Sequence, residues 1–100
     1  MEKATPHYAL AAMQALVAAA GRHAFTKKAV EGGIAMGLSD VDMLAVIASL
    51  TRQQFYKSMT TYDDHRIWQD VYHGKCPNGL TAYIKLTLAS DRIVIQFKEK

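Results

Sequence analysis

The change in composition halfway along the chain constrains the fold more than any other feature of the sequence. Thirteen of the fifteen alanines precede residue 51, whereas residues 51–100 are rich in Thr, Tyr, Ile and Val. Alanine favours helices, and β-branched and aromatic residues favour strands. A chain of 100 residues is the size of one domain. The sequence therefore predicts a single α+β domain over residues 1–100, with N-terminal helices packed on a twisted, mainly antiparallel sheet.

The first half of the chain predicts three helices from its spacing and capping residues. Thr5-Pro6 is the expected start of a helix over residues 6–20, and Gly21 is its expected end. Thr26 can cap a second helix that ends at Gly37, and the capping box of Ser39 and Asp42 opens a third. The residues expected on the inner faces of the second and third helices are Val30 and Ile34, then Val41, Leu44, Ile47 and Ala48.

The second half predicts a strand hairpin with a defined register. Apolar residues alternate with polar ones over residues 80–88 and again over residues 93–97, and Ser90-Asp91 between them is typical of a tight turn. A two-residue turn there pairs residues whose numbers add up to 181. Tyr83 then lies across from Lys98, and Lys85 across from Gln96, all four on the solvent side of the sheet.

The excess of positive charge also lies in the second half. Residues 1–50 carry four basic and four acidic side chains, while residues 51–100 carry eight basic and five acidic ones, which gives the net charge of +3. Lysines neutralise phosphates and aromatic rings stack on bases, so a phosphate-bearing partner fits this half. A solvated basic surface that only keeps the protein soluble fits the charge equally well.

Cysteine usage fits a reducing compartment, and hydropathy predicts no membrane span. Cys76 is the single cysteine, so no internal disulfide and no cysteine-rich zinc site is expected. The apolar run Ala9–Ala20 is too short to cross a bilayer. Glu2 and Gln14 disfavour the alternative that this run is the core of a secretory signal.

Three stretches of the chain resemble one family. They are residues 55–72, which read FYKSMTTYDDHRIWQDVY, the N-terminal MEKATPH and the C-terminal FKEK. The sequence resembles the motility quorum-sensing regulator (MqsR) toxin family, in the RelE-like group of type II toxin–antitoxin ribonucleases. The resemblance covers essentially the whole chain. It implies a RelE-like fold and a cytoplasmic, metal-independent endoribonuclease that uses no cofactor, cleaves mRNA at short GC-containing sequences and inhibits growth.

The resemblance also implies the site residues and the partner. Carried over motif by motif, the catalytic residues are Lys57, Gln69, Tyr83 and Lys98, and the substrate-binding residues are Tyr56 and Met59. The family pattern has an arginine after the VY pair, where this sequence has His73; we expect His73 to bind substrate, together with Lys85 from the predicted outer face. The implied partner is a cognate antitoxin with a zinc-binding part and a helix-turn-helix part, so no direct DNA binding by this chain is expected.

These side chains suit metal-free RNA cleavage, in which the 2′-hydroxyl attacks the phosphate. Lys57 and Lys98 can stabilise the negative charge of the transition state, Gln69 can orient the reacting groups, and Tyr83 can act as acid or base. The sequence leaves the general base open, because four histidines are present and His65 within YDDHR fits a loop role better. No histidine pair has the spacing of a metal site.

The orientation of Gln69 is also open. Ile67, Gln69 and Val71 share one side of their strand, so a core-facing Ile67 and Val71 would turn Gln69 away from Tyr83. A catalytic Gln69 requires either a bulge in this strand, or Trp68 and Tyr72 facing inward with Asp70 paired.

Two alternative functions remain open from the sequence. One is a non-catalytic RNA- or antitoxin-binding module, and the other is an inactive homologue.

Overall fold

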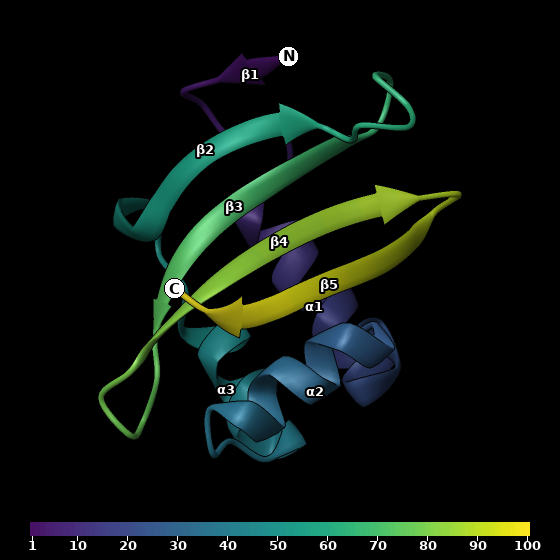
Figure 1. The fold of residues 1–100 in the computed structure, drawn as a ribbon. Helices are drawn as coiled ribbons and strands as arrows, with labels where there is room; N and C mark the ends of the chain where they lie inside the picture. Colours follow the sequence, from purple (N-terminus) through teal and green to yellow (C-terminus); the bar gives the residue numbers. More distant parts are fainter.

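The computed structural model describes all residues 1–100 as a five-stranded antiparallel sheet with three α-helices against it (Figure 1). The strands, which lie side by side in chain order, are β1 (Glu2–Lys3), β2 (Phe55–Thr60), β3 (Trp68–Lys75), β4 (Thr81–Ala89) and β5 (Arg92–Glu99). The helices are α1 (Leu10–Ala20), α2 (Lys27–Ala35) and α3 (Asp40–Ser49), with the 3-10 turns η1 (Gly21–Ala24) and η2 (Arg52–Gln54). The predicted α+β class is confirmed.

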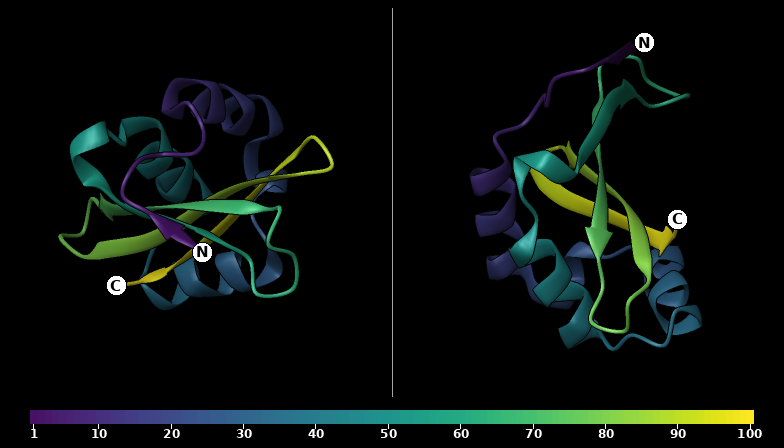
Figure 2. Two further views of the ribbon diagram at one scale, coloured as in Figure 1. Left: turned by 90° about the horizontal axis from the view of Figure 1, so that it is seen from above. Right: turned by 90° about the vertical axis from the view of Figure 1, so that its left-hand side faces the viewer.

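The helices leave one face of the sheet open. Helices α1 and α3 lie against one face of the twisted sheet, while α2 runs beside the edge strand β5 (Figure 2). The core between these layers includes Ile84, Leu86 and Ile95, whose side chains are fully buried. We call the opposite side of the sheet, which faces away from α1 and α3, the outer face.

Helix α1 starts later than the sequence predicts. Pro6 lies outside the helix, which begins at Leu10 without a side-chain cap and ends at Gly21 as expected. The reason lies in β3: the carboxylate of Asp70 accepts hydrogen bonds from the backbone N–H groups of His7 (3.0 Å) and Tyr8 (2.8 Å). Because these amides are satisfied by a side chain, the segment before α1 does not join the helix.

The caps of the next two helices are confirmed, but their inner faces are not. Thr26 Oγ1 accepts from Ala29 N–H, and Ser39 and Asp42 form both bonds of the capping box. Among the residues predicted to face inward, Ile47 is buried and Leu44 packs partly on the core, whereas Val30, Ile34, Val41 and Ala48 are exposed.

No single helix is long and apolar enough to cross a membrane. Helices α2 and α3 reach the required length and hydropathy only when they are counted together, and the pair is bent by 97°.

The β4–β5 hairpin has the predicted register. Ile84 pairs with Phe97, Leu86 with Ile95, and Tyr83 with Lys98. The two turn residues Ser90 and Asp91 have φ angles of 52° and 61°, the left-handed conformation that a type I′ hairpin turn requires at both positions. The alternation of apolar residues therefore fixes which side chains reach the outer face.

The structure also decides the orientation of β3. Trp68, Asp70 and Tyr72 point to the helices, so Gln69 lies on the outer face. Asp70 is only 1% exposed, yet its carboxylate is fully paired, because Ser58 Oγ donates to it at 2.6 Å in addition to the two amides. Of the two alternatives open from the sequence, the inward-facing paired Asp70 is the one that the structure shows.

Candidate active site

Three cross-strand rows on the outer face contain seven of the eight predicted site residues. Residues that pair directly across neighbouring strands share a face of the sheet. The rows are Met59–Gln69–Thr87, Lys57–Val71–Lys85–Gln96 and His73–Tyr83–Lys98. Val71 in the middle row is fully buried although it belongs to this face. It therefore forms an apolar floor beneath the charged side chains around it.

The eighth predicted residue, Tyr56, reaches the outer face through a bulge. The register of β2 against β3 shifts between Phe55, which pairs with Tyr72, and Lys57, which pairs with Val71. Tyr56 is the extra residue of this bulge, and a bulge allows two successive side chains to point the same way. The aromatic ring of Tyr56 accordingly stacks on His73, an outer-face residue, at a centroid distance of 4.6 Å.

His73 lies between two tyrosines. Its ring is 4.6 Å from the ring of Tyr56, at an interplanar angle of 26°, and 5.7 Å from the ring of Tyr83. The two tyrosine rings are 6.5 Å apart. Burial, with a smaller contribution from the charge of Lys100, lowers the pKa of His73 below its ordinary value of 6.5. At neutral pH the imidazole is therefore uncharged and can accept a proton.

Lysine side chains surround this aromatic group. Lys98 Nζ lies 5.4 Å from the centre of the Tyr83 ring, and Lys57 Nζ lies 5.5 Å from the centre of the Tyr56 ring. Lys85 is close enough to both other amines that burial and then the charges of Lys98 and Lys57 lower its pKa. Three ammonium groups thus share one patch, which attracts a polyanion.

One of these amines has an acidic partner that the sequence did not suggest. Glu2 on β1 accepts a hydrogen bond from Lys57 Nζ at 2.8 Å, an ion pair across 55 residues of sequence. This contact raises the pKa of Lys57 and lowers that of Glu2. Lys57 is therefore charged, and its ammonium group is held against the Glu2 carboxylate.

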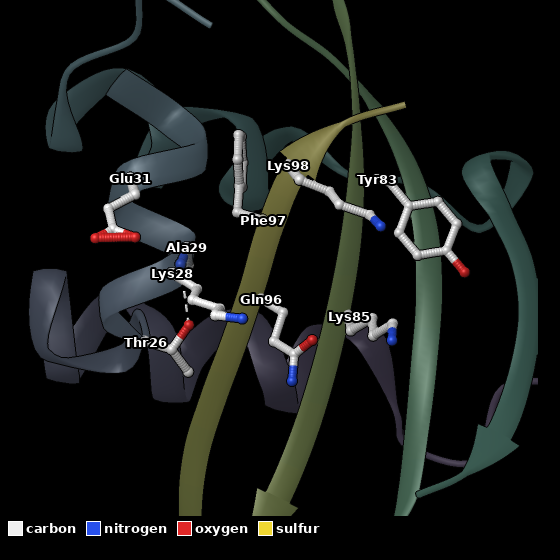
Figure 3. Close-up of a pocket in the computed structure, with 9 residues that line it drawn as sticks. All are labelled: Thr26, Lys28, Ala29, Glu31, Tyr83, Lys85, Gln96, Phe97 and Lys98. Atoms are coloured by element: carbon white, nitrogen blue, oxygen red, sulfur yellow. Dashed lines mark hydrogen bonds between the residues drawn. The ribbon is translucent and has the colours of Figure 1, made fainter. Parts of the chain in front are cut away.

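Two hollows flank the patch. A shallow one of about 330 Å³ includes Met59, His65, Gln69 and Lys85. A larger groove of about 670 Å³ lies between α2 and the strands β4 and β5, and includes Tyr83, Lys85 and Lys98 (Figure 3). Lys85 borders both hollows, so its side chain lies between them.

The histidines outside the lysine patch do not form a metal site or a second catalytic site. His7 stacks on Trp68 at 5.2 Å, and His23 lies in the turn η1, both away from the lysine patch. No group of three or more His, Cys, Asp or Glu side chains has a geometry that could hold a metal ion. The outer face and its hollows carry amines, phenols, amides, the imidazoles of His73 and His65, and the carboxylate of Glu2.

Sequence reasoning identified the outer-face residues but missed two features of the site. The register of β4 and β5 could be worked out from alternation alone, whereas the pairing of Glu2 with Lys57 leaves no local signal in the sequence. Lys28 on α2 borders the larger groove and was also missed, since the position of α2 depends on tertiary packing.

Comparison with known proteins supports the resemblance seen in the sequence. A model of the family described as "Motility quorum-sensing regulator, toxin of MqsA" matches residues 5–99. The chain is also 44% identical over 100 residues to the mRNA interferase toxin MqsR of Escherichia coli (strain K12), covering 100% of both chains. The chain therefore belongs to the motility quorum-sensing regulator family, the toxins of MqsA.

Proposed function

We propose that this protein is an mRNA endoribonuclease, the toxin of a toxin–antitoxin pair, which cleaves at short GC-containing sequences and inhibits growth. The observation that carries the proposal is the convergence of Lys57, Tyr83 and Lys98, from three different strands, on the outer face. The relative named an mRNA interferase toxin, 44% identical over its full length, supports the same activity. We also propose that the domain has the RelE-like fold.

The proposed reaction uses the RNA's own 2′-hydroxyl as the nucleophile. A bond forms between O2′ and phosphorus as the bond from phosphorus to O5′ breaks, which leaves a 2′,3′-cyclic phosphate and a 5′-hydroxyl. Lys57 and Lys98 stabilise the charge that develops on the phosphate oxygens, as positioned ammonium groups do. The Gln69 amide does not ionise near neutral pH, so Gln69 orients the phosphate or the hydroxyl from the neighbouring row.

Two neighbouring side chains can handle the protons of this reaction. We assign the 2′-hydroxyl proton to His73, because its lowered pKa keeps the imidazole neutral at physiological pH. Tyr83, whose ring is 5.7 Å from that of His73, then protonates the departing O5′. The imidazolium and the phenolate left by this step return to their starting forms by proton transfer through solvent. Tyr56 and Met59 hold the flanking bases.

The partner and the compartment follow from the family. The family is described as the toxin of MqsA, so we propose a cognate antitoxin as the protein partner. We propose that this antitoxin has a zinc-binding part and a helix-turn-helix part, which leaves DNA binding to the antitoxin. We also propose that the toxin acts in the cytoplasm, where mRNA is available.

A cleavage assay with purified protein tests this function. In excess chelator the wild-type protein should cleave mRNA, and the Lys57→Ala variant should not. Lys27→Ala is the matched control, since Lys27 is exposed on α2 and removal of its charge should leave cleavage unchanged. Intact RNA that still binds the wild-type protein would instead show a non-catalytic binding module. Cleavage that stops in chelator would contradict the metal-free reaction.

A further inference from the structure

The larger groove extends the outer face beyond the residues of the proposed reaction. Its inner end is formed by Tyr83, Lys85 and Lys98, and its outer end by Lys28 of α2 and Gln96 of β5 (Figure 3). Its volume of about 670 Å³ is in the range of sites that hold small organic ligands. The groove therefore has room for a nucleotide next to the reacting phosphate.

The wall that α2 contributes is held in place by close contacts with β5. A Cβ atom on Gly32 would lie 2.2 Å from the carbonyl oxygen of Phe97, so the glycine allows the helix to approach the strand. The N–H of Thr26, just before α2, donates to the carbonyl of Ile95 at 3.1 Å. The groove is thus a property of the folded domain rather than a gap between mobile parts.

The chemistry of the outer end suits a nucleotide. Figure 3 shows the Lys28 side chain reaching toward β5 beside Gln96, while the Glu31 carboxylate points away from the strands. Gln96 lies directly across from Lys85, and about 7 Å along β5 from Lys98, since a strand rises about 3.4 Å per residue. An ammonium group binds a phosphate, and a glutamine amide can both donate to and accept from a base edge.

We infer that the groove between α2 and β5 binds the RNA nucleotides that flank the cleaved phosphodiester on one side. Lys28 contacts a phosphate of this flanking segment, and Gln96 contacts a base edge and contributes to the choice of cleavage sequence. This inference rests on the proposed ribonuclease function. It adds a binding subsite that lies outside the set of reacting side chains.

Binding of a 2′-O-methylated RNA, which cannot be cleaved by 2′-hydroxyl attack, tests the phosphate contact. For an RNA of about 12 nucleotides, Lys28→Ala should weaken binding about 3- to 10-fold and reduce the salt dependence by about 0.7 in log–log slope. Binding of a trinucleotide should not change. The control Lys27→Ala removes the same charge from the same helix outside the groove, and should change neither. Equal losses in the two variants, or no loss with Lys28→Ala, would overturn the inference.

Mapping of cleavage ends tests the base contact. Gln96→Ala should lower the rate at the preferred sites more than at other sites, and so broaden the base preference at one position beside the cleaved bond. An unchanged preference would overturn the role of Gln96. Wild-type protein that cleaves unmodified RNA, together with Lys28→Ala that binds the 2′-O-methylated RNA as tightly as the wild type, would disprove only this subsite. Wild-type protein that does not cleave unmodified RNA would disprove the proposed function. If Lys28→Ala weakens antitoxin binding and not RNA binding, the groove is a protein interface and the inference is wrong.

Discussion

Asp70→Asn should destabilise the protein strongly although it changes only one oxygen to a nitrogen. The Asp70 side chain is 1% exposed and accepts three hydrogen bonds. One oxygen accepts from His7 N–H and Ser58 Oγ, and the other accepts from Tyr8 N–H at 2.8 Å. An asparagine has one accepting oxygen, so its NH₂ group must face either the Tyr8 amide or the His7 amide, donor against donor.

The cost can be worked out from these bonds. The backbone amide left without an acceptor costs about 1–3 kcal/mol. The two bonds that remain lose the charge of the carboxylate, about 1 kcal/mol each, because bonds to charged groups are roughly twice as strong as neutral ones. The sum of about 3–5 kcal/mol is a large part of a typical stability of about 5–15 kcal/mol. At about 4 °C or more per kcal/mol, Tm should fall by at least about 12 °C.

Thermal and urea unfolding measure this loss. Asp63→Asn is the matched control, since Asp63 is exposed in the loop between β2 and β3, and the same change there should leave Tm unaltered. Ser58→Ala removes one of the three bonds and should give a smaller loss than Asp70→Asn. A Tm for Asp70→Asn within about 4 °C of the wild-type value would refute the reasoning that this carboxylate holds the N-terminal segment against β3.

Three further predictions concern the outer face and the core. Tyr83→Phe and Lys98→Ala should abolish RNA cleavage. The far-UV circular dichroism spectrum and Tm of both variants should stay native, because both side chains lie on the solvent side of the sheet. If either variant still cleaves RNA, the replaced side chain takes no part in the reaction. The cleavage rate of the wild-type protein should fall as the pH drops through the lowered pKa of His73, since protonation removes the proton acceptor. His73→Gln should lose most of the activity, and its remaining rate should no longer fall at low pH. If the rate of His73→Gln still falls at low pH, the fall belongs to another group. Tyr72→Phe should be as stable as the wild type or about 1 kcal/mol more stable, because the buried Tyr72 hydroxyl has no hydrogen-bond partner; a loss of more than about 1 kcal/mol in urea unfolding would indicate a partner for that hydroxyl.

The parts of the fold that the sequence predicts well are those set by local rules. The alternation in β4 and β5 and the turn at Ser90-Asp91 determine which residues pair, because a slip of one residue would expose the whole core face. Capping by Thr26 and by Ser39 is equally local. The family resemblance added Lys57 and Gln69, which no periodicity places next to Tyr83.

The features that the sequence does not predict depend on contacts between distant segments. The start of α1 moves to Leu10 because a carboxylate from β3 takes the preceding amides. Val41 is exposed because the face that α3 buries is set by the way it packs against α1 and the sheet. The bulge that brings Tyr56 beside His73 and the pairing of Glu2 with Lys57 are likewise visible only in three dimensions.

Analysis of the RNA ends made by the purified protein in chelator tests the proposed chemistry most directly. Attack by the 2′-hydroxyl on a phosphate held by Lys57 and Lys98 should give fragments with 2′,3′-cyclic phosphate and 5′-hydroxyl ends, and Lys57→Ala should give none. Fragments that carry 3′-hydroxyl and 5′-phosphate ends would show that water is the nucleophile, and would contradict the reaction proposed for the outer face.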